Sequence, residues 1–189
     1  MRNSAFIAIC LLCLIAACGG TTTNDEGPDT SITVDQIVGV WKVESVQVLK
    51  DTCHFPNMDL DDELGTYSYI EKADASHVSV YDCGTDATCA NKSDPETYEY
   101  TAGRITFPGG DQDMASVGTC KMILDMADAI ATVTNPSTAT FNMSAAVRFD
   151  GDCDAVKTMS ANDPAYPDKT VGDYDGCQIQ VKQINKKEP

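Results

Sequence analysis

The stretch ATFNMSAAVRF, residues 139–149, decides the fold class of this 189-residue chain. Apolar residues recur there at every second position, namely Ala139, Phe141, Met143, Ala145, Val147 and Phe149. Only an extended strand places alternate side chains on one face, whereas a helix needs a period of about 3.6 residues. We therefore predict a β-strand here, with one buried face and one face in water.

The same kind of pattern predicts further strands along the chain. They span residues 40–50, 66–71, 77–82, 96–101, 104–107, 119–134 and 177–184, which brings the total to eight. Within residues 119–134 the apolar phase slips, and a β-bulge near Met126 and Ala127 explains the slip within one strand. A helical turn at that point is the alternative. Thr33 is placed to cap a short helical turn that ends at Ile37, just before the first strand.

The connections between these strands alternate in length. Long connections cover residues 51–65, 83–95, 108–118 and 150–176, whereas short ones cover 72–76, 102–103 and 135–138. In an up-and-down antiparallel array, alternate connections lie at opposite ends, so the four long loops should share one end. Eight such strands can close into a barrel with room for side chains or one small ligand. The predicted fold is thus all-β, an eight-stranded antiparallel up-and-down barrel, with a β-sandwich as the alternative.

A short motif at the start of the first strand carries a family resemblance. Gly39 and Trp41, after a short helical turn, are similar to the Gly-x-Trp signature of the lipocalins. The resemblance implies a barrel whose tryptophan closes the narrow end and whose open end carries the longer loops. Lipocalins usually place an arginine late in the chain against this tryptophan. No arginine follows Arg148 here, so either Lys182 or Lys186 substitutes for it, or the domain is one of the looser bacterial lipocalin-like relatives.

The N-terminus has the composition of an export signal. Arg2 precedes an apolar run of about a dozen residues, which is short for a transmembrane helix and ends in LIAAC at residues 14–18. Small residues before a cysteine resemble the lipobox of bacterial lipoproteins. The resemblance implies cleavage after Ala17 and lipidation of Cys18; an ordinary secretory signal is the alternative.

These features divide the chain into three parts. Residues 1–17 are the predicted signal peptide, 18–30 a flexible polar tether and 31–189 the lipocalin-like domain. We expect an exported protein that contacts the membrane through its lipid anchor. Lipoproteins of this kind are commonly retained at the inner membrane by an aspartate after the cysteine. Gly19 stands there, which favours the outer membrane.

Six cysteines remain after the signal peptide and Cys18 are set aside: Cys53, Cys83, Cys89, Cys120, Cys153 and Cys177. An even number in an exported protein predicts three disulfides, whereas zinc would favour closely spaced pairs of cysteines or histidines. The topology places all six at the long-loop end. The pairings that we favour are Cys153–Cys177, Cys83–Cys89 and Cys53–Cys120.

Charge restricts the partners of the protein. The chain has 29 acidic and 13 basic residues, a net charge of −16, so nucleic acid and anionic lipid head groups are not expected partners. Most of this charge falls in the long loops, and the predicted rim should concentrate a basic ligand or a divalent ion. Acidic loops that are merely solvated are the alternative.

The acidic residues could bind calcium, which prefers carboxylate oxygen ligands. The alternation of Asp150, Asp152 and Asp154 resembles a calcium-binding loop. An EF-hand then needs glycine and glutamate where this chain has Ala155 and Ala161. These aspartates are therefore weak calcium candidates, and no metal site or cofactor is predicted.

The sequence contains no catalytic signature, so we do not expect an enzyme. A Gly-x-Ser-x-Gly elbow, a His-Glu-x-x-His motif, a Walker loop and a dinucleotide fingerprint are all missing, and the two histidines are His54 and His77. The leading interpretation is non-catalytic binding of a small apolar or cationic ligand inside the barrel. The alternative is a cell-surface structural or interaction protein whose barrel is filled with side chains. A cavity below about 300 Å³ would favour that alternative.

Overall fold

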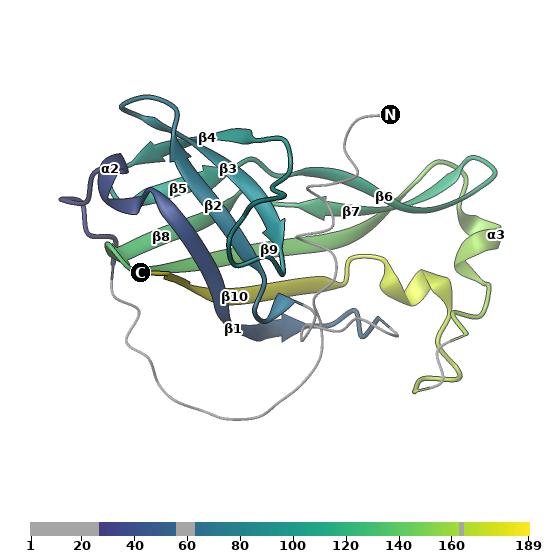
Figure 1. Cartoon of the computed structure of the whole chain (residues 1–189). Coiled ribbons are helices and arrows are strands. Elements are labelled where there is room, and N and C mark those ends of the chain that lie inside the picture. The colour runs from purple at the N-terminus through teal and green to yellow at the C-terminus, as the bar shows by residue number, and fades with distance from the viewer. Residues whose placement is uncertain (1–26, 56–62, 163–164) are drawn as a thin grey trace.

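The computed structural model describes residues 27–55, 63–162 and 165–189, and Figure 1 shows the arrangement of its elements. The predicted signal peptide, Cys18 and most of the predicted tether lie outside the described residues. The strands are β1 (Gly39–Asp51), β2 (Tyr67–Lys72), β3 (His77–Gly84), β4 (Glu96–Thr101), β5 (Arg104–Phe107), β6 (Gly110–Val117), β7 (Cys120–Met126), β8 (Ala129–Asn135), β9 (Thr138–Asp150) and β10 (Gln178–Lys187). The short helical elements are α2 (Val34–Ile37), α3 (Asp154–Lys157) and the 3₁₀ helix η2 (Val171–Tyr174).

Eight of the strands close into an antiparallel barrel, which confirms the predicted fold class. Their order is β1-β2-β3-β4-β5-β8-β9-β10, and β10 pairs with both β9 and β1 to complete the circle. This closure excludes the β-sandwich. The strands predicted at residues 96–101 and 104–107 coincide with β4 and β5, and the other predicted strands differ from the observed ones mainly at their ends.

The strand predicted over residues 119–134 consists of β7 followed by β8. Both pair with the same edge of β9, one after the other. Between the register positions of Met126 and Ile130, three residues on this side oppose two on β9. The backbone N–H of Ala127 still donates to the carbonyl of Ser144 at 3.0 Å. The extra residue is the predicted bulge, so the alternative of a helical turn is wrong.

The long loop predicted over residues 108–118 is wrong, because β6 occupies most of it. β6 pairs with β7, and the two form a hairpin that turns at Gly118, where φ is +63°, and extends beyond the barrel (Figure 1). The sequence of β6, GDQDMASV, has little apolar alternation because this edge strand is exposed along most of its length. The hydrophobic periodicity of the sequence therefore could not predict this strand.

The described residues build two hydrophobic cores. One core lies inside the barrel beside α2 and includes Ile37, Trp41 and Ile105. The second includes Leu124, Val147 and Ile179, on strands that continue past the barrel, together with Tyr174 of η2. The connection between β9 and β10, which was predicted as a plain loop, therefore supplies part of a packed core. It also carries α3, which Figure 1 places at the far end of the molecule from α2.

Trp41 closes the barrel at the α2 end, as the lipocalin resemblance implied. Its side chain is 2% exposed, and its Nε1–H donates to the carbonyl of Ile37, the last residue of α2, at 2.8 Å. The predicted helical turn is confirmed, and the backbone N–H of Thr33 donates to the side-chain oxygen of Gln36 at 2.8 Å. Helix and tryptophan together form the floor of the barrel.

A lysine stands opposite Trp41, but it is neither Lys182 nor Lys186. Lys187 is the register partner of Trp41 across β1 and β10, and its ammonium donates to the carbonyl of Gln36 at 3.0 Å. The ammonium of Lys186 instead donates to Thr138 Oγ1 at 2.9 Å. The expected position was wrong because register, and not chain order alone, selects the residue that reaches the helix.

Candidate ligand-binding site

The barrel contains a cavity of about 380 Å³. Ile37 and Trp41 lie at its floor, and Ile70 and Ile105 line its walls. At the opposite end it is bordered by the start of the β6–β7 hairpin and by Met126. The volume exceeds the lower limit of about 300 Å³ for typical small-molecule sites.

Short side chains on β8 and β9 leave this space open. Ala129, Ala131 and Ala139 line the cavity and are buried, so their methyl groups occupy interior positions where larger residues would fill the barrel. The aromatic part of the wall is formed by Tyr98, Phe107 and Phe141, whose neighbouring ring centroids lie 4.4 and 5.2 Å apart. The result is an apolar chamber with one aromatic side.

A few polar groups interrupt this lining. The hydroxyl of Tyr98 donates to Glu96 Oε2 at 2.8 Å. On β10, the side-chain amide of Gln183 donates to Asn185 Oδ1 at 2.8 Å, and both residues line the cavity. No lysine, arginine or histidine is among the described residues that line it. The site therefore offers apolar contact and hydrogen-bond acceptors, but no positive charge for an anionic ligand.

Three disulfides lie at the end of the barrel opposite α2, and they join all six predicted cysteines. They are Cys53–Cys177, Cys83–Cys89 and Cys120–Cys153. The predicted pairing of Cys83 with Cys89 is confirmed, whereas Cys153–Cys177 and Cys53–Cys120 are wrong.

Sheet neighbours explain the two wrong pairings. Cys53 follows β1 and Cys177 precedes β10, and these strands pair directly where the barrel closes. Cys120 begins β7, whose next residue is in register with the last residue of β9, so Cys153 lies close by. The order of the loops along the chain favours the other two pairs, because loop order does not contain the contacts that barrel closure and the hairpin create.

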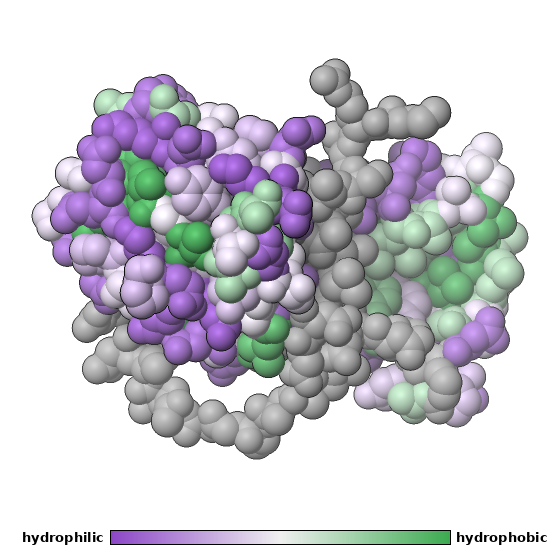
Figure 2. All heavy atoms as spheres, viewed as in Figure 1, coloured by the Kyte–Doolittle hydropathy of each residue, from purple (hydrophilic) through white to green (hydrophobic). Residues whose placement is uncertain are grey.

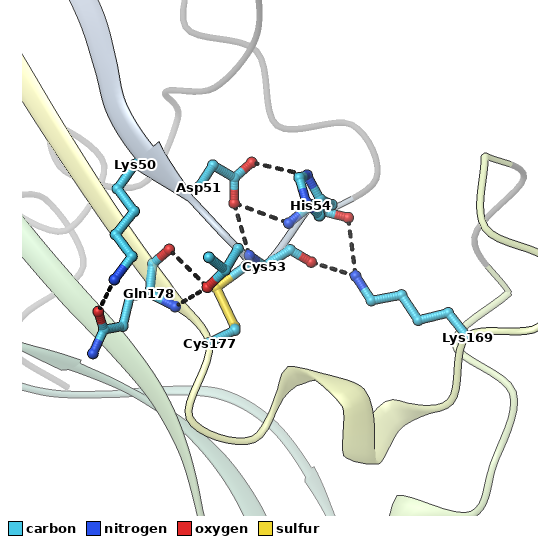
Figure 3. Close-up of a disulfide and its surroundings, with 8 residues drawn as sticks. Lys50, Asp51, Cys53, His54, Lys169, Cys177 and Gln178 are labelled. Carbon is cyan, nitrogen blue, oxygen red and sulfur yellow. Dashed lines mark hydrogen bonds and ion pairs between the residues drawn. A yellow bond between two sulfur atoms is a disulfide. The ribbon is translucent and has the colours of Figure 1, made fainter.

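Hydrogen bonds fix the chain around Cys53–Cys177, as Figure 3 shows. The carboxylate of Asp51 accepts from the backbone N–H groups of Cys53 and His54 at 2.8 and 2.9 Å. The ammonium of Lys169 donates to the carbonyls of the same two residues. This contact holds the connection between β9 and β10 against the end of β1. These residues therefore stabilise this part of the rim.

Neither histidine belongs to the barrel cavity. His54 lies at the rim, where its ring is 5.4 Å from that of Tyr166. His77 begins β3 on the outer surface, where Ser76 Oγ and an Asp74 oxygen approach the same ring nitrogen, Nδ1, at 3.2 and 2.9 Å. A catalytic triad needs the two partners on opposite ring nitrogens, so this cluster does not have that arrangement.

The cluster at His77 instead stabilises the turn before β3. The backbone N–H of Ser76 and then the ring of His77 donate to Asp74, and these hydrogen bonds lower the pKa of its carboxyl to about 2. The carboxylate therefore stays charged throughout the neutral range. Its partners all belong to one exposed turn, which indicates a local structural role.

The calcium candidates do not converge on one point. Asp150 ends β9 and Asp154 begins α3, with Asp152 between them. Within the described ranges, no group of three or more histidine, cysteine, aspartate and glutamate side chains is placed to hold a metal ion.

A second hollow, of about 430 Å³, lies outside the barrel between the β6–β7 hairpin and the connection from β9 to β10. Its lining includes Met114, Met122, Phe149 and Met159. In Figure 2 hydrophobic residues gather at this end of the molecule, whereas much of the visible barrel surface is hydrophilic. This hollow could not be predicted from the sequence, because β6, which forms one side of it, lacks the apolar alternation that marks a strand.

Glu96, Gln183 and Asn185 are polar site residues that the sequence did not single out. Period-two alternation places Glu96 with Tyr98 on one face of β4, but it does not say which face is internal. Gln183 and Asn185 on β10 interrupt the apolar alternation, so the sequence alone suggests that both side chains face the solvent.

The fold and the cavity define a class: a closed eight-stranded antiparallel barrel of lipocalin-like architecture with an accessible interior. Comparison of the chain with protein-family models, curated proteins and solved structures gave no match. Among the described residues, no helix has the length and apolar character needed to cross a membrane.

Proposed function

We propose that this protein is an exported, lipid-anchored binding protein that holds a small apolar or cationic molecule inside its barrel and performs no catalysis. The observation that carries the proposal is the cavity of about 380 Å³ with its apolar and aromatic lining. It supports binding over the alternative of a structural protein with a filled barrel.

The geometry of the N-terminal segment supports an orientation for the anchored protein. The backbone N–H of Asp29 donates to the carbonyl of Val133 at 3.0 Å, and Asp29 also lies against the turn at Gly103. The chain thus reaches the barrel at its closed end. The nine residues from Gly19 to Gly27 span at most about 30 Å, so an anchor at Cys18 would keep the floor near the membrane and the mouth facing away.

Titration with the neutral dye N-phenyl-1-naphthylamine tests binding in the barrel. We expect dye fluorescence to rise on binding to the wild-type protein. Ala131→Phe places a ring in the cavity and should weaken dye binding by about tenfold or more. The matched control is Ala161→Phe, which makes the same change in the hollow outside the barrel.

The two variants separate the barrel from the outer hollow. Near-ultraviolet circular dichroism should show that both variants keep native packing. Dye binding that is lost in Ala161→Phe but kept in Ala131→Phe would place the site outside the barrel. Failure of the wild-type protein to bind the dye would favour a filled or inaccessible interior.

A further inference from the structure

The carboxylate of Glu96 is the feature of the cavity that most narrows the class of ligand. Glu96 and Asp111 are the acidic residues among those lining the cavity. Asp111 forms an ion pair with Arg148. Glu96 forms no ion pair with any residue that the structure describes, and its hydrogen-bond donor is the hydroxyl of Tyr98. Within the part of the chain that the structure describes, one lining carboxylate thus has no cationic partner.

Tyr98 holds this carboxylate in place. Its ring is 6% exposed and packs against Phe107, with ring centroids 4.4 Å apart. The hydroxyl binds Oε2 of Glu96 at 2.8 Å. A second oxygen, Oε1, remains to accept from a ligand. Glu96 itself is exposed, so its carboxylate lies at the solvent-accessible part of the cavity beside an aromatic wall, and both groups attract a cation.

We propose that the cavity selects amphiphilic amines, with the ammonium group bound to Glu96 and the apolar part lying against Ile105, Ala131 and Trp41. This inference rests on the proposed function, because it assigns a head-group preference to the same cavity. Two features support it: the absence of basic side chains among the described lining residues and the unpaired charge of Glu96. An anionic amphiphile would meet repulsion at this carboxylate, whereas an alcohol would forgo the charge-assisted bond.

Competition against N-phenyl-1-naphthylamine tests the preference with three probes of equal chain length: octylamine, octan-1-ol and octanoate. In the wild-type protein we expect octylamine to displace the dye at a concentration about tenfold lower than octanol, because the ammonium gains a charge-assisted hydrogen bond. Octanoate should be the weakest competitor. Glu96→Gln should bring octylamine to the level of octanol and leave octanol unchanged.

Glu99→Gln is the matched control. Glu99 is also exposed, but period-two alternation places it on the opposite face of the same strand, where it accepts from Thr101 Oγ1 at 2.9 Å, so this variant removes the same charge from the outer face. It should keep the preference for octylamine. Tyr98→Phe frees the carboxylate from its hydrogen bond and should weaken octylamine more than octanol.

The outcomes distinguish this inference from the proposed function. Equal losses of octylamine affinity in Glu96→Gln and Glu99→Gln would assign the preference to overall acidity and overturn the role of Glu96. Equal binding of octylamine and octanol to the wild-type protein would overturn the inference and leave the proposed function standing. Failure of the dye and all three probes to bind would contradict both.

Discussion

At the scale of single residues, Gly39 and Trp41 determine how the barrel closes. Trp41 fills the floor and binds the end of α2 through its indole N–H. Gly39 has a φ of +141°, and a Cβ there would lie 2.7 Å from Cε of Lys187, the residue that reaches over to α2. The Gly-x-Trp motif therefore has a local physical reason. Gly39 allows the backbone conformation that the turn into the strand needs, and the Trp41 side chain closes the end of the barrel.

Gly39→Ala tests this reading of the motif. A side chain in this backbone conformation is strained, and the Lys187 side chain must move, so we expect a loss of about 1–3 kcal/mol in the free energy of unfolding. Gly110→Ala is the control, because a Cβ there meets nothing within 4 Å. Urea denaturation measures both variants. Equal stability of the two would show that the conformation of Gly39 is not required.

At the scale of elements, the alternation of apolar residues predicted the barrel strands. It did not predict the edge strand β6 or the strand register that determines the disulfide pairs. The bulge between β7 and β8 was visible because the apolar phase of residues 119–134 slips by one position. β6 was not visible, since an exposed edge strand needs no apolar face. Disulfide partners followed from which strands pair, and the order of the cysteines along the chain does not contain that information.

The sheet positions of the disulfides predict unequal contributions to stability. Cys53–Cys177 joins β1 to β10 across a sequence separation of 124 residues, whereas Cys83–Cys89 spans 6. Loop-closure entropy gives a loss of about 4–5 kcal/mol for Cys53→Ala/Cys177→Ala and about 2 kcal/mol for Cys83→Ala/Cys89→Ala. Guanidinium unfolding measures the two double variants. A larger loss for the second would contradict the account of barrel closure.

At the scale of the whole molecule, the protein is a barrel with one closed end and one elaborated end. The closed end receives the chain from the N-terminal side, whereas the β6–β7 hairpin and α3 lie at the opposite end (Figure 1). All three disulfides also lie at that opposite end. The sequence predicted this polarity from loop lengths. The cavity could not be predicted from the sequence. Alternation shows that Ala129 and Ala131 share one face of a strand, but it does not show that their short side chains leave the interior unfilled.

The proposed anchor makes a prediction at the same scale. Cys18→Ser removes the thiol to which the proposed lipid would be attached, so the protein should move from the membrane fraction to the soluble fraction of the envelope. Dye binding should be unchanged, since the tether reaches the barrel at the closed end. Fractionation followed by immunoblotting gives the readout. Retention of Cys18→Ser in the membrane fraction would contradict lipid anchoring at this residue.

Native mass spectrometry of the protein purified from its own cells tests most directly whether the barrel is a binding site. Wild-type protein should carry an additional small-molecule mass that disappears on denaturation, and Ala131→Phe should lack it while keeping three disulfides. Ala161→Phe should retain the adduct. A bare polypeptide mass for the wild-type protein, together with no dye binding, would contradict the claim that the barrel holds a ligand.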